Sequence, residues 1–282
     1  MKLGLAELKS SSPQIMAVLN ATPDSFSDGG ALLNDKHQLD LSLVLARVEQ
    51  FLKGGAAIID VGGESTRPGS VPVSVSEELD RVVPVIEAIT KRFDVAVSVD
   101  TSTPEVMKES ANVGAALIND VRALSRPGAI EAAALTGLPV CLMHMAGEPD
   151  SMQDKPHYND VVAEVRDFLL ARVRNCVQAG IHSSKILLDP GFGFGKTLAH
   201  NLTLFRNLDK FIALGFPLMV GVSRKSMIGT ILDKPVDQRV TGSVAMAMLA
   251  AQRGAHVLRV HDVAATADAL KILKVLEDGN DG

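Results

Sequence analysis

The chain repeats one pattern along its length: a helix-like amphipathic stretch, a short apolar run and then a polar side chain. Runs of this kind, apolar on both faces, are typical of buried parallel strands. Eight such runs occur, at residues 15–19, 57–59, 95–99, 115–118, 140–143, 186–188, 218–222 and 257–258. The pattern therefore predicts eight parallel strands.

Apolar residues at helical spacing between the runs predict helices. These stretches are residues 41–52, 77–91, 105–113, 161–178, 202–214, 241–253 and 264–276. Eight strand-then-helix units favour a (β/α)8 TIM barrel in the α/β class, and an open doubly wound sheet is the alternative. Because no linker divides the chain, we expect a single domain over 15–278, with an N-terminal extension at 1–14 and a tail at 279–282.

Polar residues follow the predicted strands at the end where barrel enzymes build their active sites. They are Asn20, Asp60, Asp100, Asn119, Asp189, Lys225, Arg259 and His261. For any one of them, the alternative is that the strand simply runs out into water. The complete set nevertheless suits a ligand with a polar ring and an anion.

The segment 58–69 carries the strongest local signal. Its strand bears Asp60, and Gly62 and Gly63 remove side-chain bulk, which predicts that a ligand packs against this backbone. Pro68 and Gly69 keep the following residues from forming a helix, so that Arg67 is held on a loop above the strand end.

Two further loops have the composition of ligand-binding segments. Residues 20–30 are polar and rich in turn residues, and Phe26 among them predicts a lid, although an ordinary surface loop is the alternative. Residues 187–197 end in Gly-Lys-Thr, but Pro190 stands where a phosphate-binding P-loop needs glycine. We expect the glycines of this second loop to let a flat ligand approach the backbone.

The last two strands supply the cations for an anion site. Lys225 follows the seventh strand, and alternation places Arg259 and His261 on one face of the eighth. No residues have zinc spacing, so any metal should be Mg²⁺ bridging phosphate oxygens and a neutral oxygen such as that of Asn20. His144 is interpreted equally well as a hydrogen-bonded core residue or a functional one.

Composition excludes some partners. A net charge of −5, no tryptophan, one tyrosine and no basic run argue against nucleic-acid binding. Residues 1–12 lack the apolar segment of a signal peptide and no apolar run is long enough for a membrane span, so we expect a cytoplasmic protein. Cys141 and Cys176 lie in apolar patterns and are expected to be reduced core residues.

The chain resembles the dihydropteroate synthase family of pterin-binding enzymes from residue 15 to about residue 276. The resemblance lies in residues 19–30, 59–69, 99–101, 119–120, 189–196, 221–226 and 259–262. The one small departure is Ala21, where valine is usual. The resemblance implies a (β/α)8 transferase, usually a homodimer, that joins (7,8-dihydropterin-6-yl)methyl diphosphate to 4-aminobenzoate in folate biosynthesis. It also implies Mg²⁺ dependence and sulfonamides as competitors of aminobenzoate.

The resemblance assigns roles by position. The implied pterin-binding residues are Asp60, Asp100, Asn119, Asp189, Lys225, Met143 and Phe194, the last two sandwiching the ring. The implied diphosphate-binding residues are Asn20, which also contacts Mg²⁺, with Thr66, Arg67, Arg259 and His261. The implied aminobenzoate-binding residues are Phe26, Asp28, Thr66, Arg67, Pro68, Ser223 and Lys225. Catalysis would depend on Asp100, Asp189, Lys225 and Arg259.

Charge placement favours a dissociative reaction, in which the C–O bond to diphosphate breaks before aminobenzoate attacks. Direct displacement is the alternative. Two other functions are a methyltetrahydrofolate methyltransferase, which needs no diphosphate clamp, and a pterin-binding protein without catalysis, whose loops should be damaged. A face at residues 244, 245, 247, 248 and 251 serves either a second subunit or packing on the barrel.

Overall fold

The computed structural model describes residues 3–8, 12–22, 39–65, 73–147 and 156–278. Five residues with expected roles lie outside these ranges, and they are Phe26, Asp28, Thr66, Arg67 and Pro68.

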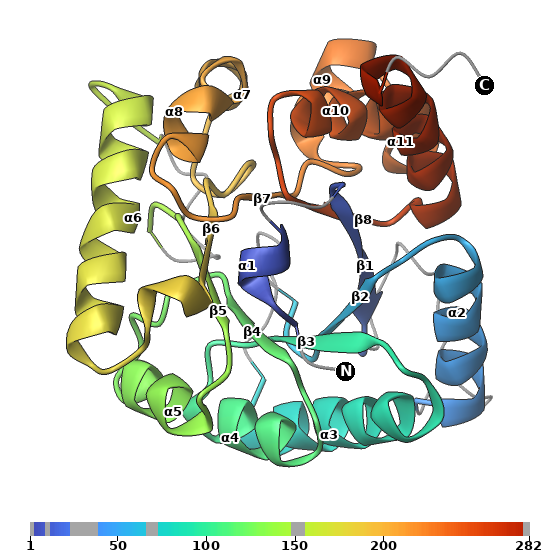
Figure 1. Cartoon of the computed structure of the whole chain (residues 1–282), viewed down its shortest axis with the longest axis vertical. Coiled ribbons are helices and arrows are strands. Elements are labelled where there is room, and N and C mark those ends of the chain that lie inside the picture. The colour runs from blue at the N-terminus through green and yellow to red at the C-terminus, as the bar shows by residue number, and fades with distance from the viewer. Residues whose placement is uncertain (1–2, 9–11, 23–38, 66–72, 148–155, 279–282) are drawn as a thin grey trace.

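Eight parallel strands form a closed barrel (Figure 1). They are β1 Gln14–Asn20, β2 Ile58–Gly62, β3 Ala96–Asp100, β4 Leu117–Asp120, β5 Val140–Met143, β6 Ile186–Asp189, β7 Met219–Val220 and β8 Val257–Val260. Their order is β6-β5-β4-β3-β2-β1-β8-β7, and a parallel bridge between Leu188 and Leu218 joins the two ends. The predicted barrel is thus confirmed, and the open sheet is excluded.

Helices form an outer ring around the strands (Figure 1). They are α2 Leu41–Lys53, α3 Val75–Arg92, α4 Pro104–Asn112, α5 Ala129–Thr136, α6 Val161–Gln178, α7 Leu198–Arg206, α8 Leu208–Ile212, α9 Ser226–Leu232, α10 Val240–Gln252 and α11 Val263–Asp278, with short 3-10 turns at Ser183–Lys185 and Val236–Gln238. Side-chain caps fix where several helices begin. Ser74 and Glu77 form a reciprocal capping box at the start of α3, and Asp160 caps the start of α6. Among the described residues, no helix has the length and apolar character needed to cross a membrane.

One helix prediction was wrong, and helices α5 and α9 were not predicted. The stretch 202–214 is not one helix, because it breaks at Asn207 into α7 and α8. The Asn207 side chain donates a hydrogen bond to the backbone carbonyl of Thr203 and so competes with the helical backbone hydrogen bonds. Helix α5 was not predicted, since its alanine-rich sequence favours helix without an alternation of polar and apolar faces.

On β2, β3, β4, β6 and β8, the barrel interior changes from apolar to polar within two residues. The lower layer consists of Met16, Ile58, Ala96, Leu117, Cys141, Leu187, Met219 and Val257. The short helix α1 (Leu5–Leu8) lies at the centre of the ring in Figure 1, and its Leu5 and Leu8 pack on this layer. The expected N-terminal extension therefore closes the amino end of the barrel.

Burial also settles the cysteines. Cys141 and Cys176 are free and buried, which confirms that they are reduced core residues.

Candidate active site

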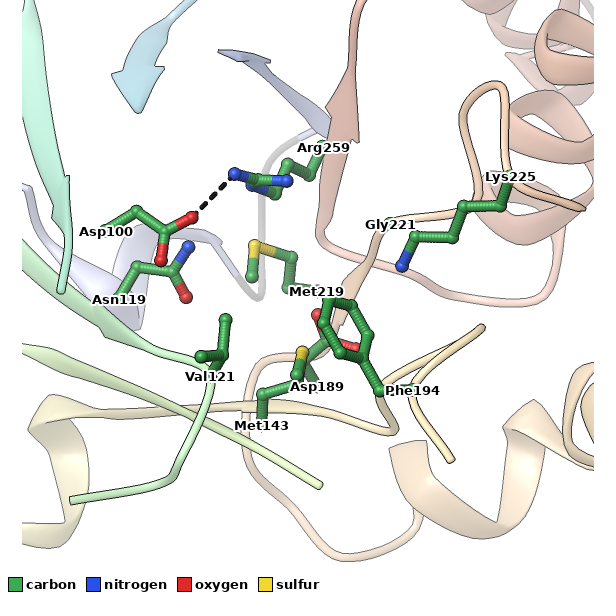
Figure 2. A pocket seen from close by; sticks show the side chains of 10 residues that line it. All are labelled: Asp100, Asn119, Val121, Met143, Asp189, Phe194, Met219, Gly221, Lys225 and Arg259. Atoms are coloured by element: carbon green, nitrogen blue, oxygen red, sulfur yellow. Dashed lines mark hydrogen bonds and ion pairs between the residues drawn. The ribbon is translucent and has the colours of Figure 1, made fainter. Parts of the chain in front are cut away.

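A cavity with about 320 Å³ of empty space, including its open mouth, lies at the carboxyl ends of the strands. Its lining residues come from β3 to β8 and the loops after them (Figure 2), and they are Asp100, Asn119, Val121, Met143, Asp189, Phe194, Met219, Gly221, Lys225 and Arg259. Seven of these carry sequence-based assignments, so residues up to 159 positions apart in sequence meet here as expected. The assignments missed Val121 and Met219, because apolar residues next to strand ends give no chemical signal.

Arg259 on β8 reaches across the barrel to two carboxylates. Its Nε donates to Asp60 Oδ2 at 2.7 Å, and one of its terminal nitrogens donates to Asp100 Oδ2 at 2.8 Å. Asn119 Nδ2 also donates to Asp60 Oδ2, at 3.1 Å. Asp60 is fully buried and absent from the cavity lining. Its expected contact with the ligand ring stays a prediction; in this structure Asp60 lies behind Arg259 and Asn119 and accepts hydrogen bonds from both.

Burial changes the proton affinities of the lining residues. It raises the pKa of Asp100 to about 7, with Asp60 adding to the rise and Arg259 opposing it. Burial likewise raises the pKa of Asp189, against the nearby Lys225. The pKa of Lys225 falls to about 8 for the same reason, against Asp189. For Arg259, burial alone would lower the pKa, but Asp60 and Asp100 outweigh it and the net shift is upward, so this guanidinium stays charged.

The loop after β7 presents Lys225 to the cavity. Lys225 Nζ donates to the carbonyl of Phe192 and lies 4.6 Å from the centroid of the Phe194 ring. Its neighbour Arg224 has a left-handed backbone, with φ of +57°, which is strained for a residue with a side chain. A bidentate ion pair between Arg224 and Asp262 stabilises that conformation.

Three residues expected at the anion and aminobenzoate sites lie outside the cavity lining. Ser223 Oγ contacts both His261 Nδ1 at 3.1 Å and the His261 backbone N–H at 3.2 Å, so these two residues form a pair just after β7 and β8. Asn20 is the last residue of β1 and is partly buried. Any role for these three involves the rim of the barrel.

Three glycines of the expected ligand-facing loops lie close to other parts of the protein. A Cβ on Gly191 would lie 1.8 Å from the carbonyl oxygen of His144, and one on Gly195 would lie 2.6 Å from that of Ala146. A Cβ on Gly63 would meet the Val82 side chain of α3 at 2.6 Å. Gly191, Gly195 and Gly63 therefore let protein segments pack closely, and the expectation that glycines here also make room for a ligand stays a prediction.

A buried polar network around Glu64, just after β2, was also missed. Glu64 accepts from Arg122, whose side chain is 8% exposed, and Arg122 donates to Ser102. Asp120 accepts from the hydroxyl of Ser102 and from two backbone N–H groups. The only sequence signal was Asp120 directly after Asn119. This network fixes Glu64, in the turn that follows β2.

The side chains near the cavity also bear on metal binding. Within the described ranges, no three His, Cys, Asp or Glu side chains are grouped to hold a metal ion. The neutral oxygen of Asn20 at the barrel rim suits Mg²⁺ that takes most of its ligands from phosphates and water. The residues present thus fit a metal that binds together with an anionic ligand.

Fold and cavity together define a (β/α)8 barrel protein whose strand ends enclose a small polar site lined by both carboxylates and cations. Residues 16–261 match the family described as "Pterin binding enzyme". The dihydropteroate synthase of Escherichia coli (strain K12) is 55% identical over 264 residues, covering 94% of this chain and 92% of that protein.

Solved structures agree. The dihydropteroate synthase of Yersinia pestis in a sulfonamide drug complex is 54% identical, covers 95% of each chain and superimposes with a TM-score of 0.91. That of Xanthomonas albilineans with 4-aminobenzoic acid is 48% identical, covers 95% of this chain and 94% of that one, and has a TM-score of 0.87. The chain belongs to the pterin-binding enzymes and, among them, to the dihydropteroate synthase family of transferases.

Proposed function

We propose that the cavity binds a dihydropterin ring, and that the enzyme condenses (7,8-dihydropterin-6-yl)methyl diphosphate with 4-aminobenzoate. The products are 7,8-dihydropteroate and diphosphate, within folate biosynthesis. One observation carries the proposal: Asp100, Asn119, Asp189 and Lys225 leave four different strand ends and line one cavity. Family membership is the independent support.

The polar groups of the cavity match the hydrogen-bonding edge of a pterin. That ring presents an amide and an aminopyrimidine, which together need acceptors for N–H groups and donors for a carbonyl and ring nitrogens. Asp100 and Asp189 supply acceptors, Lys225 supplies donors and Asn119 supplies both. Met143 and Phe194 supply apolar contact for the ring faces. Binding without these partners would leave buried polar groups unpaired, at about 1–3 kcal/mol each.

We further propose a dissociative mechanism, in which the C–O bond to diphosphate breaks first. The methylene cation that forms is delocalised into the pterin, where the carboxylates of Asp100 and Asp189 stabilise positive charge, with Asp60 behind them. Arg259 uses two of its five N–H donors on Asp60 and Asp100 and retains others for the leaving group. The neutral amine of 4-aminobenzoate then attacks carbon without a protein nucleophile. Direct displacement is the competing mechanism.

Asn20 is proposed to hold Mg²⁺ together with the diphosphate oxygens. When bound, the metal would neutralise negative charge on the leaving group. Arg67 and His261, with Thr66, are proposed to complete the diphosphate site around Arg259. His261 is oriented for this by its contact with Ser223 Oγ.

The aminobenzoate is proposed to bind at the rim, between Ser223, Lys225 and the segments that carry Thr66, Arg67 and Pro68, with Phe26 and Asp28 closing over it. Ser223 and Lys225 flank the strained Arg224, so one stabilised turn sets the position of both. Sulfonamides, which share the aniline ring, are proposed to compete for the same position.

The decisive experiment supplies the pterin diphosphate and 4-aminobenzoate, with and without Mg²⁺, and measures dihydropteroate. Formation that depends on both substrates and on Mg²⁺ is expected; no product with the metal present would contradict the proposed function. Omission of 4-aminobenzoate then tests the mechanism. Release of diphosphate in its absence is expected for dissociation, whereas direct displacement requires the second substrate before any diphosphate appears.

We propose a homodimer, and its main support is a group of exposed apolar residues on α11. The small-residue face of α10 gives less support. Ala247 and Ala251 of that face are buried within the chain. The neighbouring α11, however, exposes Ile272, Val275 and Leu276 at 61%, 59% and 74%. Light scattering should show a dimer that Val275→Glu converts to monomer, whereas Leu135→Glu, at a site 81% exposed on α5, leaves it intact. A monomeric parent protein would refute the dimer.

A cytoplasmic location is proposed as well. Its support is chemical: both cysteines are unpaired and buried, which is usual in a reducing compartment.

A further inference from the structure

Lys196 is a buried lysine whose contacts are unusual. Its side chain is 4% exposed, and its Nζ lies 2.8 Å from the carbonyl oxygen of Gly191, 2.9 Å from that of Phe194 and 3.3 Å from that of His144. The same nitrogen lies 2.9 Å from His144 Nδ1. One amino group therefore joins the end of β5 to two points of the loop that follows β6.

The partners of this amino group are neutral. Burial and the charge of Lys196 lower the pKa of His144 to about 3, so the imidazole is uncharged and accepts the hydrogen bond from Lys196. In the described part of the chain, no carboxylate forms an ion pair with Lys196. Burying an amino group among neutral groups costs free energy. The part of the fold that these hydrogen bonds hold in place is the loop after β6.

The loop needs such an anchor. Gly191, Gly193 and Gly195 all have positive φ, at +71°, +81° and +60°, and a glycine-rich backbone loses more conformational entropy on ordering than any other. Within the loop, one backbone hydrogen bond, from Phe194 N–H to the Gly191 carbonyl, is 3.2 Å long. The Lys196 amino group donates to the carbonyls of both Gly191 and Phe194 and so fixes the turn between these two residues.

The anchored loop forms one wall of the cavity (Figure 2). It begins at Asp189, whose Oδ1 accepts from the Gly191 N–H at 2.7 Å. It includes the Phe192 carbonyl that accepts from Lys225, and it ends with the Phe194 ring beside Lys225 Nζ. A displacement of the Gly191–Phe194 turn would therefore move the Asp189 environment, the Lys225 amino group and the Phe194 ring together.

We propose that Lys196 is a positioning residue for the pterin ring, acting through Phe194 and Asp189 without touching the substrate. The inference rests on the proposed function, since it assumes that the cavity holds a pterin. It differs from a purely structural role because the damage should fall mainly on the pterin. The pterin is proposed to meet Asp189, Phe194 and Lys225, whereas 4-aminobenzoate meets only Lys225 among these three.

The test compares Lys196→Met, which keeps the stem and removes the donors, with Lys185→Met. Lys185 is a matched control: it is exposed and donates to the Gly137 carbonyl at 2.6 Å, in another loop. Binding of 6-hydroxymethylpterin is measured by calorimetry, and both KM values are measured in the synthase assay. We expect Lys196→Met to weaken pterin binding at least tenfold and to raise the KM for the pterin diphosphate to match. The KM for 4-aminobenzoate should change less than threefold, and Lys185→Met should change neither.

Unchanged pterin affinity, or equal changes in both KM values, would overturn the proposal. Failure of the unmodified protein to bind the pterin would instead contradict the proposed function, so the two failures are distinguishable. A double-mutant cycle with Phe194→Leu adds a readout that a structural role would not move. If Lys196 acts through Phe194, then Lys196→Met should weaken pterin binding less than threefold when Phe194→Leu is already present.

If Lys196→Met does not fold, His144→Leu replaces it, because it removes one acceptor and leaves the carbonyl contacts. A two- to fivefold loss of pterin affinity is then expected in a folded protein, and no loss would count against the role of Lys196.

Discussion

The guanidinium of Arg259 and the carboxylate of Asp60 form an ion pair with a 2.7 Å hydrogen bond inside the barrel. The two residues are 199 positions apart in the sequence. The pair links the last strand to the second, and a second bond from Arg259 to Asp100 extends it to the third. Arg259 is therefore placed by carboxylates before any substrate is present.

The first prediction concerns this pair. Arg259→Ala leaves the fully buried Asp60 without its cation, so the free energy of unfolding should fall by about 3 kcal/mol. Urea unfolding measures the change. Arg253→Ala is the control, since Arg253 is exposed at the end of α10, and its substitution should cost less than about 1 kcal/mol. Equal stability of the Arg259→Ala and parent proteins would show that the pair has no net structural value.

The second prediction concerns Gly191. Alanine at this position would force a Cβ to 1.8 Å from the His144 carbonyl, on a backbone that already has positive φ. We expect a loss of more than about 3 kcal/mol in unfolding free energy, together with loss of pterin binding. Gly180→Ala provides the comparison, because its φ is +95° but nothing lies within 4 Å of the added Cβ. That change should cost only about 1–2 kcal/mol, the strain of the backbone itself.

The third prediction concerns acid stability. Burial lowers the pKa of His144 from its ordinary 6.5 to about 3, so between these values the unfolded chain binds a proton that the folded protein does not. Stability from this residue is complete above pH 6.5 and falls as the pH drops toward 3, by up to about 1.4 kcal/mol per pH unit. The free energy of unfolding of the parent and of the His144→Leu protein, each at pH 7.5 and at pH 5, measures this contribution. The substituted protein should lose clearly less stability on acidification, and parallel losses would exclude His144 as a source.

The fourth prediction concerns the turn between Ser223 and Lys225. Asp262→Asn replaces a charged, bidentate partner of Arg224 by a neutral one, which should loosen the strained backbone at φ +57°. The loss of a charged hydrogen bond, about 1.5 kcal/mol, corresponds to a roughly tenfold rise in the KM for 4-aminobenzoate. Asp268→Asn, in an exposed pair with Lys271 on α11, is the control and should leave both KM values unchanged. A rise in the pterin KM alone would contradict the assigned position of this turn.

Sequence patterning was sufficient for the architecture and for most of the cavity. Short apolar runs located all eight strands, because burial on both faces leaves a continuous apolar stretch that can be recognised from local sequence alone. The polar residue after each run then identified Asp100, Asn119, Asp189 and Lys225, since a barrel brings all carboxyl strand ends together. The break at Asn207 escaped prediction because it depends on one side-chain hydrogen bond.

By itself, the sequence determined the eight strands and most of the helices, which strand ends carry polar chemistry and to which family the chain belongs. Only the tertiary structure decided how those groups pair: Asp60 lies behind Arg259, and the Gly191 backbone packs directly against the His144 carbonyl. Only there does the Lys196 amino group meet three carbonyls and an imidazole. The physical reason is that periodicity reports the burial of a side chain, whereas its partners are set by distances between strands and loops far apart in the sequence.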